Sequence, residues 1–196
     1  MKVGQHREVG AGEDVRPVLV LLNGIPASGK STLARAWCAR STSGLPLALD
    51  IDVLRGMLGG WRRMRLEAGL AARSMAIAAI RTHLLGGHDV VVPQYVRQTG
   101  FIDELAGIAR QTSAAFLECA LLVDHRSALE RFTTRSAGAA EHGRPDDEGE
   151  LDEPMDATEE AFTRFLRGRP DAVLLASSEA DLIDQLDRAI ARARLR

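Results

Sequence analysis

Short apolar runs alternate along most of this chain with longer segments of helical periodicity. The runs rich in Val, Leu and Ala predict five buried strands, at residues 18–22, 45–51, 89–92, 115–123 and 172–176. Helices are predicted at residues 31–40, 53–58, 66–85, 101–111, 126–135 and 179–194, with another resuming near Asp156. Strands that alternate with helices form βαβ units. We therefore expect an α/β three-layer sandwich with a five-stranded parallel sheet covered on both faces.

The composition indicates one domain and excludes several classes of protein. A length of 196 residues and a hydrophobic content of 45% fit a single domain at residues 18–196, preceded by a polar tail at residues 1–17. The acids in this tail argue against a secretory signal, and no apolar run approaches the length of about 18 residues that a membrane span needs. Cys38 and Cys119 have no neighbouring Cys or His, which favours a reducing cytoplasm.

Charge is distributed unevenly along the chain. The net charge is −2, yet residues 136–160 hold ten acidic residues and one basic residue, Arg144. This segment is also rich in Gly and Pro, so it is either a solvated acidic loop or part of a lid at about residues 131–157 that closes over a site. Aromatic residues make up only 4% of the chain and do not interleave with a basic patch, which argues against sequence-specific nucleic-acid binding.

A glycine-rich motif follows the first predicted strand directly. Residues 24–31, Gly-Ile-Pro-Ala-Ser-Gly-Lys-Ser, match G-x-x-x-x-G-K-[ST] at every fixed position. Glycine lets the backbone curl so that amide N–H groups and the following helix N-terminus surround phosphate oxygens. We expect Lys30 to reach the β- and γ-phosphates and Ser31 to hold Mg²⁺. The predicted nucleotide-binding residues are Gly24, Ala27, Ser28, Gly29, Lys30, Ser31 and Thr32.

Two acids follow the second predicted strand. Ligands of a parallel α/β sheet lie at the carboxyl ends of its strands, so Asp50 and Asp52 are expected to face the same crevice as the glycine-rich loop. The Asp52 carboxylate is suited to accept the proton of a hydroxyl that attacks the γ-phosphate, and Arg55 is suited to hold an anionic part of the acceptor. Alternatively, Asp52 only caps the helix predicted from residue 53.

The glycine-rich motif, followed about 20 residues later by Asp52-x-x-Arg55, resembles the small P-loop kinases. This group of AAA-type P-loop ATPase domains includes polynucleotide kinase, zeta toxin, chloramphenicol phosphotransferase and gluconate kinase-like enzymes. The resemblance implies a P-loop NTPase fold with a lid, ATP as the nucleotide, Asp52 as general base and Arg55 as an acceptor contact. It also implies that Arg131 and Arg135, four residues apart on the predicted helix 126–135, are lid arginines that stabilise the transferred phosphoryl group. Alternatively, they only mark an exposed helix end.

The third predicted strand departs from the usual pattern of P-loop NTPases. These proteins place an acid at its end to hold the Mg²⁺ shell, whereas this chain has Pro93 and Gln94 there and Asp89 at the opposite end. Asp50 is then expected to support the metal together with Ser31. Gln94 and Arg97 are either acceptor contacts or ordinary loop residues.

A basic cluster at residues 61–65, Trp-Arg-Arg-Met-Arg, follows the helix predicted after Asp52. It is either a solvated face or one wall of the crevice, and in the second case the acceptor is anionic. We expect a kinase that moves the ATP γ-phosphate to a hydroxyl of a small-molecule acceptor. The alternative is a regulatory or toxin-type nucleotide-binding module that hydrolyses ATP weakly. No feature of the sequence predicts an oligomeric state.

Overall fold

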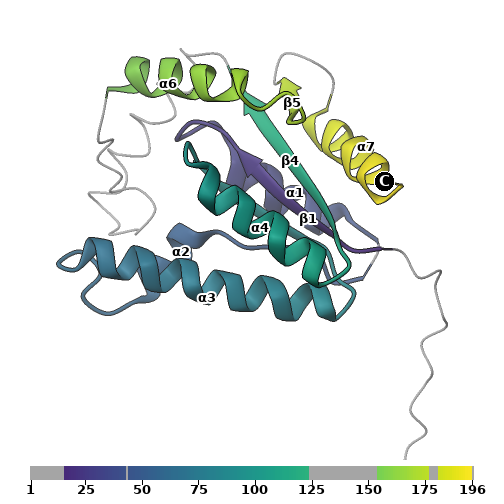
Figure 1. The fold of residues 1–196 in the computed structure, drawn as a ribbon, viewed down its shortest axis with the longest axis horizontal. Helices are drawn as coiled ribbons and strands as arrows, with labels where there is room; N and C mark the ends of the chain where they lie inside the picture. The colour runs from purple at the N-terminus through teal and green to yellow at the C-terminus, as the bar shows by residue number, and fades with distance from the viewer. Residues whose placement is uncertain (1–15, 43, 124–153, 177–180, 196) are drawn as a thin grey trace, which may run out of the picture.

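Five parallel strands form one sheet in the order β2-β3-β1-β4-β5 (Figure 1). The structure is a computed structural model, and it describes residues 16–42, 44–123, 154–176 and 181–195. The strands are β1 (Val18–Asn23), β2 (Leu47–Ala48), β3 (Val90–Gln94), β4 (Ala115–Leu122) and β5 (Val173–Ala176). All four neighbouring pairs are parallel, which confirms the predicted five-stranded parallel sheet.

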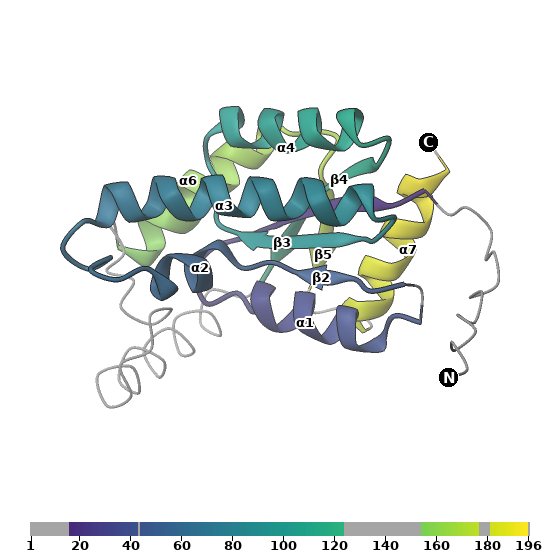
Figure 2. The same ribbon diagram turned by 90° about the horizontal axis from the view of Figure 1, so that it is seen from below.

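Helices cover both faces of the sheet, as the alternating pattern predicts. They are α1 (Lys30–Arg40), α2 (Ile51–Met57), α3 (Arg65–Leu85), α4 (Thr99–Gln111), α6 (Met155–Arg167) and α7 (Leu182–Arg194). Seen from below, α3 and α4 lie on one side of the sheet and α1 lies on the other (Figure 2). The α7 helix packs with α1 on that second face. The three-layer sandwich is therefore confirmed.

The central strand β1 divides the core into two layers. Leu19 and Leu21 pack with α3 and α4, while Val20 and Leu22 pack on the other face with α1 and α7. All four side chains are fully buried. A strand buried on both faces reads as an unbroken apolar run, which is why residues 18–22 predicted a strand without any alternation. The loop that follows β1 is thereby held on the most rigid element of the sheet.

The second strand is shorter than predicted. Residues 45–51 form an apolar run, yet only Leu47–Ala48 pairs as a strand with β3. Before it, the N–H of Leu45 lies 3.4 Å from the ring nitrogen Nδ1 of His88 and not beside a strand. After it, Asp50 caps α2, so the helix begins at Ile51. Because Asp50 caps α2, the extended segment ends before the apolar run at residues 45–51 does.

The third strand is longer than predicted and includes a proline. It continues through Pro93 and Gln94, which pair in register with Leu22 and Asn23 of β1. Proline cannot donate a ladder hydrogen bond and is therefore confined to edges of a sheet. The β2 pairing ends opposite Val91, so Pro93 has a neighbouring strand only on the β1 side.

Several predictions fall on residues that the structure does not describe. The predicted helix at 126–135, with Arg131 and Arg135, lies outside the described residues, as do Arg144 and most of the predicted lid. The helix expected near Asp156 is α6, and the closing helix α7 begins after its N-cap residue, Asp181. Within the described ranges, no helix combines the length and the apolar character that crossing a membrane requires.

Candidate active site

The glycine-rich loop connects the end of β1 to the start of α1, at the carboxyl edge of the central strand. Gly29 is the N-cap residue of α1 and has a φ of 93°, a conformation that glycine adopts without steric cost. Ala27 has a φ of 60°, which is uncommon for a residue with a Cβ atom. Strained backbone of this kind is concentrated at functional sites, where the surrounding structure maintains it.

Gly24 lies where no side chain fits. A Cβ atom at this position would lie 3.0 Å from the carbonyl oxygen of Leu121 in β4 and 3.0 Å from Ser28 Oγ. The first contact is to strand backbone, which cannot move aside cheaply. The first glycine of the motif therefore allows the loop to pass close to the end of β4.

Lys30 is buried inside the loop. Its Nζ donates hydrogen bonds to the carbonyl oxygen of Ile25, at 2.7 Å, and to Ser28 Oγ, at 3.3 Å. The ammonium group therefore lies among the loop atoms predicted to surround a phosphate. Its chain length and three donors suit a phosphate ligand at this position.

Asp50 joins the glycine-rich loop to α2. Its Oδ2 accepts a hydrogen bond from Ser31 Oγ at 2.6 Å, and its Oδ1 accepts one from the backbone N–H of Asp52 at 3.1 Å. The cap of α2 is therefore Asp50, and the interpretation of Asp52 as a helix cap is wrong. The apolar pattern predicts a helix from residue 53, whereas α2 begins two residues earlier, at Ile51.

The Ser31 hydroxyl and the Asp50 carboxylate offer oxygen atoms to a small hard cation. Mg²⁺ prefers such donors and usually keeps several waters and substrate phosphates as further ligands. No cluster of three or more metal-ligating side chains occurs among the residues described here. A site built from Ser31, Asp50 and phosphate oxygens does not need one, so this donor set fits Mg²⁺.

Asp52, Arg55 and Gln94 come together beside this pair. Arg55 Nη2 lies 3.2 Å from Asp52 Oδ1, and the Gln94 side chain hydrogen-bonds the same carboxyl group. Burial raises the pKa of Asp52; Arg55 opposes this, and the nearby Asp50 charge adds to it. The Asp52 side chain is still 43% exposed, so a substrate can reach it. A carboxylate with a raised pKa is a stronger base than an ordinary aspartate.

The Arg55 guanidinium is held by a tryptophan. It lies 5.3 Å from the centre of the buried Trp61 ring, and the Arg62 guanidinium lies 4.8 Å from that centre. Apart from Trp61, the residues of the basic cluster at 61–65 are exposed, so its arginines form a solvated face with Arg62 lying over the Trp61 ring. Arg55 Nε and Gln94 Oε1 are both buried without a hydrogen-bond partner. Arg55 Nε can therefore donate a bond to a bound water or ligand, and Gln94 Oε1 can accept one.

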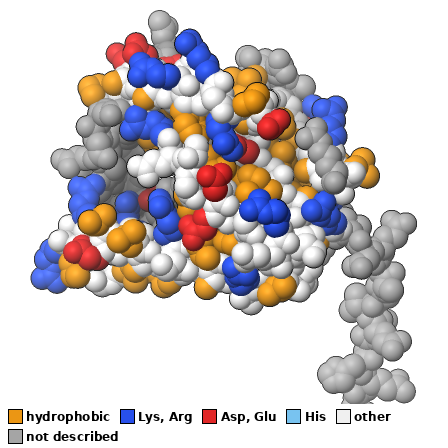
Figure 3. Space-filling view, in the orientation of Figure 1, with side chains coloured by type: hydrophobic (Ala, Val, Ile, Leu, Met, Phe, Trp, Pro, Cys, Tyr) orange, Lys and Arg blue, Asp and Glu red, His pale blue; other side chains and the backbone are white. Residues whose placement is uncertain are grey.

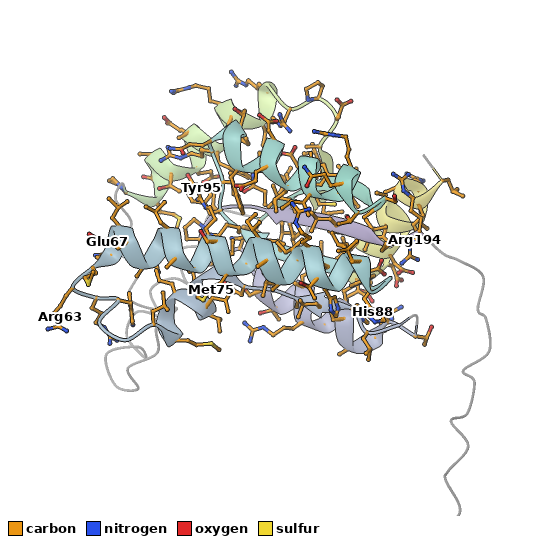
Figure 4. All side chains as sticks on the ribbon, turned by 60° about the horizontal axis from the view of Figure 1, so that its bottom comes forward. Arg63, Glu67, Met75, His88, Tyr95 and Arg194 are labelled. Atoms are coloured by element: carbon orange, nitrogen blue, oxygen red, sulfur yellow. The ribbon has the colours of Figure 1, made fainter. Side chains whose placement is uncertain are left out.

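Arg97 follows β3 on the segment that also carries Tyr95. It is exposed and its guanidinium lies 5.5 Å from the ring centre of Tyr95 (labelled in Figure 4). Tyr95 in turn packs against Phe162 of α6, with ring centres 5.9 Å apart. In the space-filling view, several Lys or Arg side chains lie along the side of the molecule between α6 and the α2–α3 end (Figure 3).

Sequence reasoning missed Asn23, the last residue of β1. This residue is fully buried at the end of an otherwise apolar strand. Its Oδ1 accepts hydrogen bonds from the N–H groups of Gly24 and Val96, and its Nδ2 donates to the Val96 carbonyl oxygen. The only signal in the sequence is a polar amide that ends a strand buried on both faces.

Asp89 is a structural residue at the opposite end of the sheet. It is buried, accepts a hydrogen bond of 2.9 Å from the N–H of Val18, and pairs with Arg194 of α7. Figure 4 shows Arg194 and Tyr95 toward opposite ends of the molecule. Asp89 therefore cannot replace the acid that is missing after β3.

Comparisons with known proteins agree with this architecture. A family model described as an AAA domain matches residues 19–170. No curated protein matches the chain by sequence.

Three solved structures illustrate the similarity of fold. A candidate kinase from Chloroflexus aurantiacus is 20% identical, with 89% of this chain and 98% of that chain covered at a TM-score of 0.64. A gluconokinase from Sinorhizobium meliloti is 18% identical, with 90% and 91% covered at 0.51. Kti12 from Chaetomium thermophilum, in complex with ADP-AlF3, is 21% identical, with 89% and 99% covered at 0.57. At these identities, the likeness shows a shared fold.

Proposed function

This chain belongs to the AAA domain family, and we propose that it is a kinase that transfers the γ-phosphate of ATP to a hydroxyl group of a small molecule. The observation that carries the proposal is the placement of Asp52, a carboxylate with a raised pKa that is accessible from solvent. Asp50 links it to the loop that binds phosphate, because one Asp50 oxygen accepts from Ser31 and the other from the Asp52 backbone.

The glycine-rich loop supplies the nucleotide site. Lys30 and the loop amides bind the β- and γ-phosphates, while Ser31 and Asp50 hold Mg²⁺, which offsets negative charge on the phosphates. A protein of the same fold has been crystallised with ADP-AlF3, a nucleotide and a mimic of a phosphoryl group in transfer. This supports nucleotide binding by the present chain.

Asp52 and its neighbours supply the acceptor site. Asp52 accepts the proton of the acceptor hydroxyl as the hydroxyl oxygen attacks the γ-phosphorus, the bond from that phosphorus to the bridging oxygen breaks and ADP leaves. Gln94 orients the carboxylate. Arg55, supported by Trp61, binds an anionic part of the acceptor. We propose Arg131 and Arg135 as the cations that stabilise the transferred group. We also propose that the enzyme works in the reducing cytoplasm.

A screen tests this proposal directly. Hydroxyl-bearing metabolites, antibiotics and nucleosides are incubated with Mg²⁺ and ATP, and phosphorylated products are detected by mass spectrometry. Lys30→Ala is the blank, and Asp52→Asn is expected to bind ATP but to transfer phosphate about 10²- to 10⁴-fold more slowly. Phosphoryl transfer that is unaffected by Asp52→Asn would contradict the general-base role.

One observation favours a second function, a regulatory or toxin-type module with weak ATP hydrolysis. The β3 strand ends in Gln94, and Asp89 lies at the far end of that strand, so no β3 acid supports the metal. In that case ATP hydrolysis without any acceptor would be slow and insensitive to Asp52→Asn.

A further inference from the structure

Asn23 connects two segments that are far apart in the sequence. Its Oδ1 accepts from the N–H of Gly24 at 2.8 Å and from the N–H of Val96 at 2.9 Å. Its Nδ2 donates to the carbonyl oxygen of Val96 at 2.9 Å. Two N–H groups donate to Oδ1, and Nδ2 donates to one carbonyl oxygen. These partners determine the orientation of the side-chain amide.

Both segments lead directly into the candidate active site. Gly24 is the first residue of the phosphate loop, and its N–H is bonded by the Asn23 side chain. Val96 lies two residues after Gln94, whose side chain hydrogen-bonds Asp52. A continuous path of contacts therefore runs from the phosphate loop through Asn23 and Val96 to Gln94 and the acceptor side.

Side chains of similar size do not reproduce this link. Aspartate keeps the acceptor atom but loses the donor to Val96, and it places a charge where no solvent reaches, since Asn23 is 0% exposed. Leucine is similar in size but leaves three backbone groups without partners. The three hydrogen bonds of Asn23 therefore explain why an asparagine ends this apolar strand, whereas packing alone does not.

We propose that Asn23 is a positioning residue that couples occupancy of the phosphate loop to the placement of the segment carrying Gln94. This inference rests on the proposed function, because it assigns a nucleotide to the loop and an acceptor to the Gln94 side. When nucleotide binding fixes the Gly24 amide, Asn23 holds Val96 in place. Gln94 then keeps the Asp52 carboxylate oriented toward the γ-phosphate.

Hydrogen exchange of the full chain, followed by mass spectrometry with saturating Mg²⁺ and ATP, tests the link. In the wild type, ATP is expected to slow exchange in both segments, 18–30 and 90–100, with an effect of about five- to tenfold in the second. In Asn23→Ala, the phosphate loop still responds to ATP while segment 90–100 no longer does. If this variant does not fold, Asn23→Ser serves, because its side chain is too short to reach Val96.

A matched control separates the link from a general loss of a buried hydrogen bond. Thr112 is buried at the end of α4, and its Oγ1 donates to the carbonyl oxygens of Ile108 and Ala109. Thr112→Val removes these bonds and is expected to keep the ATP response of segment 90–100. Loss of that response in Thr112→Val as well would overturn the proposal.

Three other outcomes also overturn it, and they differ in what else they contradict. If ATP protects segment 90–100 equally in the wild type and in the Asn23 variants, or protects only segment 18–30 in the wild type, the positioning role fails alone. If ATP protects neither segment in the wild type, nucleotide binding fails too, and with it the proposed function.

Discussion

Ser31 Oγ donates a hydrogen bond of 2.6 Å to Asp50 Oδ2. The two residues belong to different parts of the fold, since Ser31 lies in the first turn of α1 and Asp50 precedes α2. The second carboxylate oxygen of Asp50 caps α2, which carries Asp52. One side chain therefore determines both the predicted metal site and the position of the proposed base.

Substituting Asp50 by Asn separates these two contributions. Asparagine caps helices as well as aspartate does, so Asp50→Asn is expected to leave the melting temperature unchanged. It removes the negative charge, and the Mg²⁺ concentration for half-maximal ATP binding should rise about tenfold or more. Asp50→Ala loses the cap as well, which costs about 1 kcal/mol in the free energy of unfolding. An unchanged Mg²⁺ requirement in Asp50→Asn would rule out the metal role.

Lys30 is expected to be essential for nucleotide binding. It is one of only two lysines in the chain, with Lys2 in the N-terminal tail, while the other 23 basic residues are arginines. Lys30→Ala removes the ammonium group that lies among the loop atoms, and ATP affinity should fall at least about tenfold. Lys30→Arg should not restore it, because a planar guanidinium differs in shape from a compact ammonium. Equilibrium binding of a fluorescent ATP analogue measures both variants.

Local signals predicted more of this protein than long-range ones. The sequence predicts the phosphate loop because its residues are consecutive, with β1 ending directly before it and α1 beginning at its last residues. The end of β2 was misplaced because apolar character alone does not show where Asp50 starts a helix. Asn23 was missed because its partner Val96 lies 73 positions away. Such contacts depend on strand order, which no single run of residues displays.

The ion pair between Glu118 and Arg169 is another long-range contact that the sequence does not predict. Glu118 lies in the interior of β4, where a buried strand predicts an apolar residue, and its side chain is only 6% exposed. Arg169 Nη2 lies 2.5 Å from its Oε2 and Nε lies 3.0 Å from it, which satisfies the charge. The two residues are 51 positions apart, so nothing near Glu118 in the sequence indicates the partner.

Asp89 is expected to matter for stability and not for nucleotide binding. Its carboxylate accepts from the Val18 N–H and pairs with Arg194, and it is only 5% exposed. Asp89→Ala leaves the buried Val18 N–H without this acceptor and the partly exposed Arg194 without its ion pair, and the loss should be about 1–3 kcal/mol in the free energy of unfolding. The Mg²⁺ dependence of ATP binding should be unchanged at a temperature where the variant is folded. A raised Mg²⁺ requirement would instead connect Asp89 to the metal.

The raised pKa of Asp52 predicts how activity depends on pH. Burial makes the largest contribution, and Arg55 is the strongest opposing influence. A general base acts only when ionised, so the rate should fall as the pH drops through a pKa above the ordinary aspartate value of about 3.9. Arg55→Gln removes the main influence that lowers the pKa, so the acidic limb of kcat/KM should move to higher pH. Arg81→Gln, an exposed substitution on α3 that only loses a bond to Gln111, is the control.

The same pKa determines the direction of a stability change. Because the folded protein binds the Asp52 proton more tightly than the unfolded chain does, the contribution of this group to stability is largest at low pH. It declines as the pH rises from the unfolded pKa through the folded one. At neutral pH the ionised carboxylate is therefore unfavourable, and Asp52→Asn should raise the melting temperature while lowering kcat about 10²- to 10⁴-fold. The stability difference should shrink as the pH falls below the folded pKa. A lower melting temperature for Asp52→Asn at neutral pH would mean that Arg55 and Gln94 outweigh burial, and that this carboxylate is held as a structural anion and not poised as a base.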